Sequence, residues 1–204
     1  MNDVEIRDSF HRKRLRRQHA RAGTLVVDEL GLNHGRCRAD IAVINGSLVG
    51  YEIKSDCDSL NRLAEQVRSY NAVFDRAFMI VGERHRVAVQ GYIPDWWGLI
   101  LAARGVRGAV SFETMRPARK NEGIDPISVA QLLWRTEAAE ILRHRGLSPK
   151  ILRQPRAILY EYLVDALSGH ELRRTVTDCL RLRRNWRCPV PPSRYGGSCR
   201  PAAT

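Results

Sequence analysis

Two short apolar segments joined by Asn45-Gly46 constrain the fold of this chain more than any other feature. Asp40 precedes the first segment, and Glu52 and Lys54 lie at the end of the second. Asn-Gly between two apolar segments is a strong signal for a β-hairpin, because both residues tolerate a positive φ. Side chains alternate along a strand, so Glu52 and Lys54 are expected on one face, about 7 Å apart. An antiparallel partner strand can then bring Asp40 beside them.

Charged side chains in strands this apolar need a partner. Burying two carboxylates and an ammonium group carries a large desolvation cost unless the groups form pairs or bind a cation. Carboxylate oxygens are hard ligands suited to Mg²⁺, and an ammonium group can hold a nucleophilic water molecule or a phosphate. Asp40, Glu52 and Lys54 are therefore the groups expected at a Mg²⁺ site for phosphodiester hydrolysis.

The order of the predicted elements indicates an α/β fold with a mixed sheet. The first half of the chain is expected to form a helix, three strands, a helix and a strand, with two further strands after them. The predicted ranges are a helix over 4–20, a strand over 24–30, the two hairpin strands, a helix from 58 or 59 to 72, and strands over 76–82, 86–93 and 97–102.

The second half of the chain is predicted to be helical. A loop over 116–126 precedes helices near 127–145, 155–167 and 169–186. We therefore expect three parts, which are a core over 1–115, a helical extension over 116–187 and a tail over 188–204. The tail is rich in Pro, Gly and Ser and is predicted to be disordered.

The chain carries a large excess of positive charge. Its 34 Lys and Arg residues against 22 Asp and Glu residues give a formal net charge of +12. Arginine dominates the excess and suits bidentate contact with phosphate, so DNA is the expected partner, with RNA as an alternative. An arginine-rich genome would produce the same excess without such a partner. The residues predicted to contact nucleic acid are Arg12, Lys13, Arg14, Arg16, Arg17, Arg36 and Arg38.

The sequence predicts neither a membrane span nor a secretion signal. It contains no run of about 18 apolar residues, and its N-terminus is charged rather than apolar. The five cysteines form no C-x-x-C pair, so neither a zinc site nor a disulfide framework is indicated. A cytoplasmic protein with reduced thiols is expected.

The hairpin and its charged residues resemble the PD-(D/E)XK nuclease superfamily. Asp40 stands in the position of the motif aspartate, and Glu52-Ile53-Lys54 stands in the position of E-x-K. Ala39 replaces the proline of the motif. The resemblance covers roughly residues 1–85, and a likeness to a bacterial subfamily extends to about residue 187. It implies a restriction-endonuclease-like core.

This resemblance also implies roles for the charged residues. Asp40 and Glu52 would ligate one or two Mg²⁺ or Mn²⁺ ions together with the backbone carbonyl of Ile53, and Lys54 would orient or help deprotonate the attacking water. Three auxiliary residues are implied as further ligands, supporting groups or phosphate contacts, namely Glu29, Gln66 and Tyr70. Each also has a structural alternative: a solvated acid at a strand end for the first, and helix packing for the other two.

Two functions are open on the sequence. The first is a metal-dependent deoxyribonuclease of the repair, recombination or mobile-element kind. The second is a catalytically inactive DNA-binding or scaffold module on the same fold. Retention of Asp40, Glu52 and Lys54 together favours the enzyme. A homodimer is compatible with this class, because nucleases that cut duplexes and junctions often act as dimers.

Overall fold

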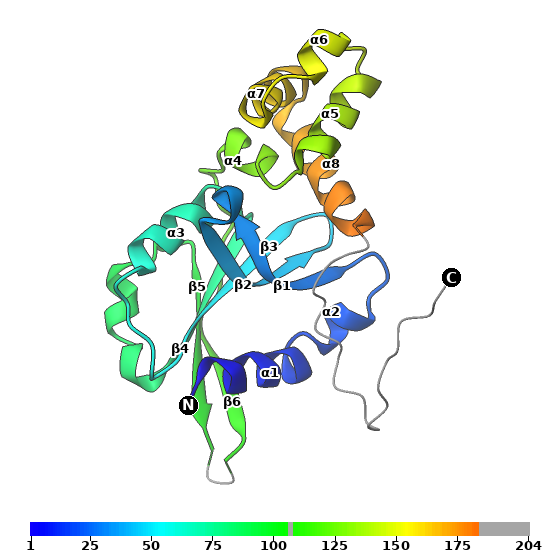
Figure 1. Cartoon of the computed structure of the whole chain (residues 1–204). Coiled ribbons are helices and arrows are strands. Elements are labelled where there is room, and N and C mark those ends of the chain that lie inside the picture. Colours follow the sequence, from blue (N-terminus) through cyan, green and yellow to red (C-terminus); the bar gives the residue numbers. More distant parts are fainter. Residues whose placement is uncertain (106–107, 184–204) are drawn as a thin grey trace.

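The computed structural model describes residues 1–105 and 108–183, and one six-stranded sheet lies at its centre (Figure 1). The strands, in sheet order, are β1 (Leu25–Leu32), β2 (Cys37–Ile44), β3 (Leu48–Lys54), β4 (Arg76–Gly82), β5 (Gly98–Arg104) and β6 (Val110–Arg116). β1, β2 and β3 pair antiparallel, β4 is parallel to both β3 and β5, and β6 is antiparallel to β5. The expected α/β fold with a mixed sheet is confirmed.

Helix α1 (Asp3–Lys13) covers one face of the sheet (Figure 1). Ile6 and Phe10 of α1 are buried against apolar side chains of the strands, among them Ile41 and Val43 of β2. Because side chains alternate along β2, Ala42 and Ile44 point to the opposite face. The two faces therefore support two separate hydrophobic clusters.

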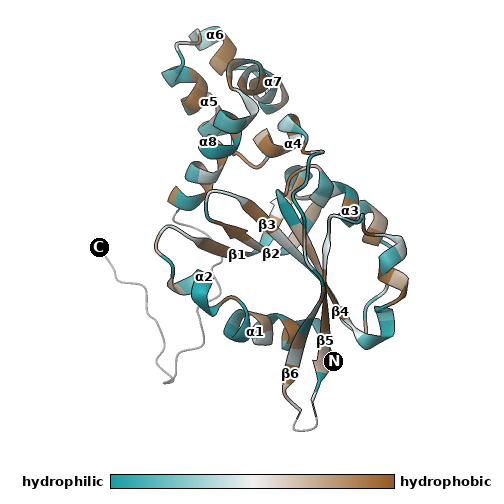
Figure 2. Cartoon of the chain, turned by 180° about the vertical axis from the view of Figure 1, so that it is seen from behind, coloured by the Kyte–Doolittle hydropathy of each residue, from teal (hydrophilic) through white to brown (hydrophobic). Residues whose placement is uncertain are grey.

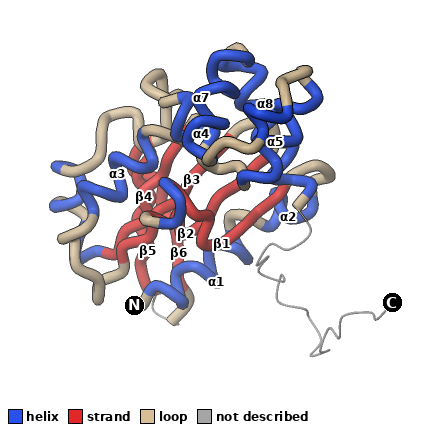
Figure 3. Tube along the Cα trace, turned by 45° about the horizontal axis from the view of Figure 1, so that its top comes forward, coloured by secondary structure: helices blue, strands red, loops and turns tan. Residues whose placement is uncertain are grey.

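On the opposite face, β2 contacts α3 and α8, and the other helices of the second half of the chain pack beyond them (Figure 3). These helices are α3 (Leu63–Asn71), α4 (Pro126–Ala130), α5 (Arg135–His144), α6 (Pro149–Leu152), α7 (Arg156–Ala166) and α8 (Gly169–Leu182). One hydrophobic cluster contains residues of the strands, of α3 and of α4, α5, α7 and α8. This cluster contains residues from both sides of the predicted division between residues 115 and 116. The division itself stays a prediction.

The predicted helix over 4–20 is interrupted at Arg14 and Leu15. α1 ends at Lys13, and α2 (Arg16–Ala20) begins after Leu15, whose side chain is buried in the cluster on the α1 face. The backbone N–H groups of Arg14 and Leu15 both donate to the carbonyl of Phe10, so the chain tightens and turns there. The prediction of one continuous helix is wrong, and its basic residues belong to two helices.

Two 3₁₀ turns replace the predicted strand over 86–93. They span Glu83–His85 and Ala88–Gly91. Val87 and Val89 alternate as in a strand, but Val87 is largely exposed whereas Val89 is fully buried. The N–H of Ile93 donates to the carbonyl of Val89, which is a helical spacing. The buried residues Val89 and Ile93 are four positions apart, as on a helix, whereas a strand would bury every second residue. The strand prediction is therefore wrong.

Three other boundaries differ from the prediction. The edge strand β6 has no predicted counterpart, because most of its residues are polar and exposed. The helix predicted from residue 58 or 59 begins at Leu63, and the one predicted over 127–145 is divided into α4 and α5. The predicted tail over 188–204 lies outside the described residues. Within the described ranges, no helix has both the length and the apolar character needed to cross a bilayer.

Candidate functional site

The charged residues of the hairpin lie where β2 and β3 separate. The Asn45-Gly46 turn is confirmed, with Gly46 at a φ of +92°. Main-chain pairing of the two strands ends at Ile41 and Tyr51, immediately before Asp40 on β2 and Glu52 on β3 would face each other. The two carboxylates therefore stand at an opening in the sheet.

Side chains replace the missing ladder hydrogen bonds at this opening. The backbone N–H of Asp40 donates to the Tyr70 hydroxyl at 3.2 Å, and that hydroxyl lies 3.0 Å from the carbonyl oxygen of Tyr51. The N–H of Ile53 donates to Oδ2 of Asp40 at 2.7 Å. Buried backbone groups need such partners, so Tyr70 and Asp40 stabilise the hairpin itself. No contact tests the metal-ligand role predicted for the Ile53 carbonyl, which stays a prediction.

Glu52 is completely buried, and three donors surround its carboxylate. Nζ of Lys54 donates to Oε1 at 2.7 Å, and the side-chain amide of Gln66 donates to the same oxygen. The Tyr70 hydroxyl lies 2.8 Å from Oε2. Burial raises the pKa of Glu52, and the nearby Lys54 opposes this rise. Glu52 and Lys54 do share a strand face, as predicted, and α3 brings Gln66 and Tyr70 to the same place.

Asp40 is the second carboxylate of the site and is half-buried. Burial raises its pKa well above the ordinary value, and the neighbouring Glu52 raises it further. The hydrogen bond from Ile53 and the positive charge of Arg7 act in the opposite direction. The two carboxylates thus disfavour each other's charged form, as close like charges do.

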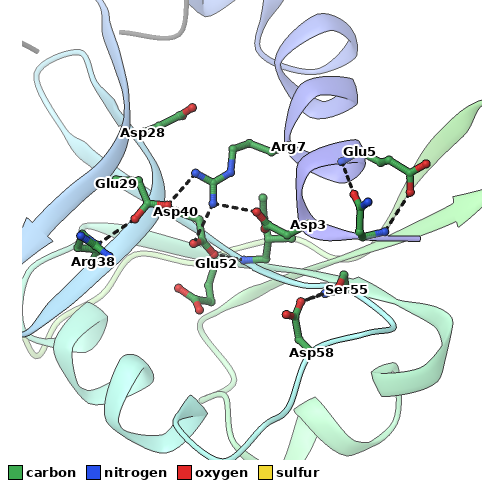
Figure 4. A network of polar contacts seen from close by, with 12 residues as sticks. Asp3, Glu5, Arg7, Asp28, Glu29, Arg38, Asp40, Glu52, Ser55 and Asp58 are labelled. Carbon is green, nitrogen blue, oxygen red and sulfur yellow. Dashed lines mark hydrogen bonds and ion pairs between the residues drawn. The ribbon is translucent and has the colours of Figure 1, made fainter. Parts of the chain in front are cut away.

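Arg7 of α1 is a second cation of the site, in addition to Lys54, and pairs with three acids (Figure 4). It was not predicted from the sequence. Its Nη1 lies 2.8 Å from Oε1 of Glu29, and its Nη2 lies 3.1 Å from Oδ2 of Asp3 and 3.3 Å from Oδ1 of Asp40. The i, i+4 spacing of Asp3 and Arg7 is the signal that could have drawn attention to it. Its contacts with Glu29 and Asp40 depend on how α1 packs on the sheet.

Glu29 lies at a distortion of β1. The pairing of β1 with β2 includes Asp28 and Leu30 but skips Glu29, whose φ is +57°. A non-glycine residue in this region costs about 1–2 kcal/mol, and such strain is often found at functional sites. The distorted backbone accompanies ion pairs from Glu29 to Arg7 and to Nε of Arg38, the latter at 3.0 Å. Glu29 is therefore ion-paired rather than simply solvated, and its auxiliary role stays a prediction.

A cavity of about 370 Å³ opens beside these residues. It is lined by Glu29, Gly35, Arg36, Cys37, Arg38, Asp40, Arg62, Glu65 and Gln66. Its walls carry as many arginines as acids, so it has no strong preference for an anion or a cation.

The residues predicted to bind nucleic acid lie in three separate places. Arg36 and Arg38 line the cavity, and Arg16 and Arg17 are exposed on α2. The remaining three, Arg12, Lys13 and Arg14, lie at the end of α1 and just beyond it. There Nζ of Lys13 donates to the carbonyl of Val110 at 2.6 Å, and Arg14 donates to Thr114 at 2.9 Å, so both contact β6.

The residues present do not fit a metal ion in this arrangement. Each carboxylate oxygen of Asp40 and Glu52 already accepts a hydrogen bond or pairs with a cation. Over residues 1–105 and 108–183, no cluster of three or more His, Cys, Asp or Glu side chains is arranged to hold a metal. Arg7 and Lys54 supply positive charge at the place where Mg²⁺ or Mn²⁺ is predicted to bind.

Comparison with known proteins gives one family. A family model described as Bacteriophage P4 protein cII matches residues 10–187. Protein cII of Enterobacteria phage P4 is 23% identical over 158 residues, which cover 78% of this chain and 59% of that protein. The chain therefore spans less than two thirds of the length of this relative. No solved structure matches the chain.

These matches contradict the predicted membership of the PD-(D/E)XK nuclease superfamily. The predictions of a hydrolase and of a metal-dependent nuclease are wrong with it. The alternative, an inactive module on a nuclease fold, gains no support from the matches either. The pattern misled because Asp40, Glu52 and Lys54 are as well suited to a buried ion-pair network as to metal binding, and here they belong to such a network.

Proposed function

The chain belongs to the Bacteriophage P4 protein cII family, and on this premise we propose that it is a DNA-binding regulatory protein of a phage rather than an enzyme. Because the chain spans 59% of the phage P4 relative, the proposal concerns this chain and not every activity of the longer protein.

The observation that carries the proposal is the excess of exposed, unpaired arginine. The formal net charge is +12, and within the described ranges exposed arginines such as Arg16, Arg17 and Arg21 have no acidic partner. Guanidinium groups bind phosphate with two parallel hydrogen bonds, and a net positive charge of this size attracts polyanions. We propose duplex DNA as this polyanion.

The network of ion pairs and hydrogen bonds around Asp40 and Glu52 has a supporting role in this proposal. Arg7 connects α1 to Asp40 on β2 and to Glu29 on β1, while Lys54, Gln66 and Tyr70 hold the buried Glu52. We propose that these contacts fix α1 and α3 on the two faces of the sheet. The network thereby determines where the basic helix α2, which follows α1, is held.

DNA binding is expected to depend strongly on salt. Each phosphate neutralised by the protein releases counterions, so log K should fall with log salt at about −0.9 per contact on duplex DNA. Fluorescence anisotropy with a labelled duplex, repeated over a range of NaCl concentrations, measures this slope. RNA of the same sequence is the matched comparison, because RNA was the alternative partner. Absence of duplex binding at low salt contradicts the proposal.

Regulation requires sequence preference in addition to binding. Selection of bound duplexes from a pool of random sequence should enrich a short motif if the protein recognises a specific site. Recovery of an unenriched pool would leave DNA binding intact and remove the regulatory part of the proposal. Homodimer formation stays a prediction, and a two-fold repeat in the enriched motif would support it.

Binding of Mg²⁺ or Mn²⁺ at Asp40 and Glu52 also stays a prediction. An ion would have to displace Arg7 from Asp40 and Lys54 from Glu52, so we expect the wild-type protein to bind it weakly at best. Calorimetric titration of each metal into the wild type and into Asp40→Asn tests this expectation. A substantial binding heat that Asp40→Asn abolishes would mean that the network opens to admit a metal.

We also propose a restriction-endonuclease-like path of the chain for the core, with no implication for activity. The support is the order α1, β1, β2, β3, α3, β4 and the change from antiparallel to parallel pairing at β3. An experimental structure compared with solved folds tests this proposal. A different strand order or a different connection between β3 and β4 would contradict it.

A further inference from the structure

Two basic segments that are far apart in the sequence meet at the turn between α2 and β1. Gly23 lies in this turn with a φ of +75°. A Cβ atom added to Gly23 would lie 2.8 Å from Nη2 of Arg181, so the guanidinium group near the end of α8 rests against this turn. Figures 1 and 3 both draw α2 and the C-terminal end of α8 near the β1 edge of the sheet.

The side chains at this junction are positively charged. α2 reads R-R-Q-H-A, and Arg16, Arg17 and the following Arg21 are exposed. Figure 2 draws α2 in the colours of hydrophilic residues. None of these three arginines has an acidic partner in the part of the chain that the structure describes. Arg181 has one, Asp178 at 3.4 Å, but both side chains are exposed, and such surface pairs contribute little stability.

The rest of the predicted basic run is less available to a ligand. Lys13 and Arg14 use their charged ends to hold β6, through Val110 and Thr114. The break at Leu15 separates them from α2. Arg12 contacts the Ser9 hydroxyl at 3.4 Å, so within the described ranges Arg16, Arg17 and the following Arg21 are the residues of this segment whose charged ends make no side-chain contact.

We infer that Arg16, Arg17, Arg21 and Arg181 form one surface, the α2–α8 surface, that binds the phosphate backbone of duplex DNA. The inference rests on the proposed DNA binding and adds where the backbone is held. Phosphate contacts position a protein on the duplex but carry no sequence information. The α2–α8 surface therefore supplies affinity, and sequence preference has to come from another part of the protein.

The test compares two variants that each lose three positive charges. One carries Arg16→Gln, Arg17→Gln and Arg21→Gln. The control carries Arg76→Gln, Arg119→Gln and Lys120→Gln, at exposed positions on β4 and in the loop after β6. Anisotropy with one labelled duplex over a range of NaCl concentrations gives the salt slope of each, and thermal denaturation verifies that both are folded.

Loss of three phosphate contacts should reduce the steepness of the slope by about 2.7, since each contact contributes about 0.9. The control should retain the wild-type slope, and Arg181→Gln alone should reduce it by about one contact. If both triple variants lose affinity and slope equally, the contacts are spread over the molecule and the inference is overturned while DNA binding stands. If the wild type binds no duplex, or binds only RNA, the proposed function fails and the inference fails with it.

Discussion

Replacing Lys54 by methionine is expected to lower the free energy of unfolding by about 3–5 kcal/mol, because it leaves a buried charge without its partner. Glu52 has no exposed surface, and Nζ of Lys54 lies 2.7 Å from its Oε1. In the variant, the carboxylate keeps hydrogen bonds from Gln66 and Tyr70 but no adjacent cation. Urea denaturation at neutral pH measures the loss.

Glu52→Gln provides the partner for a double-mutant cycle. A glutamine amide can donate to the Tyr70 hydroxyl while its oxygen accepts from Lys54, so the single variant should fold. Lys54→Met combined with Glu52→Gln should recover most of the lost stability, because no charge is then buried alone. Lys150→Met, at an exposed position, is the control and should change stability by less than about 0.5 kcal/mol. A similarly small effect of Lys54→Met would mean that Glu52 is protonated in the folded protein.

The parts of this site that were predictable are those set by local sequence. Asn45-Gly46 determines the hairpin, and the alternation of strand side chains places Glu52 beside Lys54. Gln66 and Tyr70 are four residues apart, so one face of α3 presents both to the sheet.

The parts that were missed depend on packing between distant segments. Arg7 meets Asp40 across 33 residues, and no local pattern links a helix face to an opening in the sheet. The break before α2 follows from the burial of Leu15 in the hydrophobic cluster on the α1 side of the sheet. This burial competes with the helical propensity of the surrounding arginines. Strand β6 lacks an apolar alternation because it is an exposed edge.

The function was predicted incorrectly for a related reason. A pair of buried carboxylates can be neutralised by a metal ion or by side chains of the protein, and the sequence of the hairpin is compatible with both. In the structure Arg7 lies beside Asp40 and Glu29, and it comes from a segment outside the motif. The motif therefore identified the acids, but their protein partner Arg7 could be found only in the folded structure, and the predicted metal stays a prediction.

Replacing Arg7 by methionine is expected to lower stability by about 2–3 kcal/mol at pH 8, somewhat less than a fully buried pair because the site is partly exposed. In the wild type, burial raises the pKa of Asp40, so between the ordinary and the raised pKa the folded state holds a proton that the unfolded chain has released. The contribution of Asp40 to stability is then greatest near and below the ordinary carboxyl pKa of about 4 and falls as pH rises through the raised value. Arg7 limits this fall because its charge opposes the rise in the pKa of Asp40.

The pH dependence separates lost charge from lost packing. Without Arg7, the pKa of Asp40 rises further, so the decline in stability should become larger and extend to higher pH, at about 1.4 kcal/mol per pKa unit. Denaturation curves from pH 4 to pH 9 measure it, and adding Asp40→Asn should remove most of the extra decline. Arg104→Met breaks the exposed pair with Glu5 and is the control, with little expected loss at any pH because exposed pairs contribute little stability. A loss in Arg7→Met that is equal at pH 5 and pH 8 would contradict an electrostatic role, because the removal of packing alone does not depend on the protonation of Asp40.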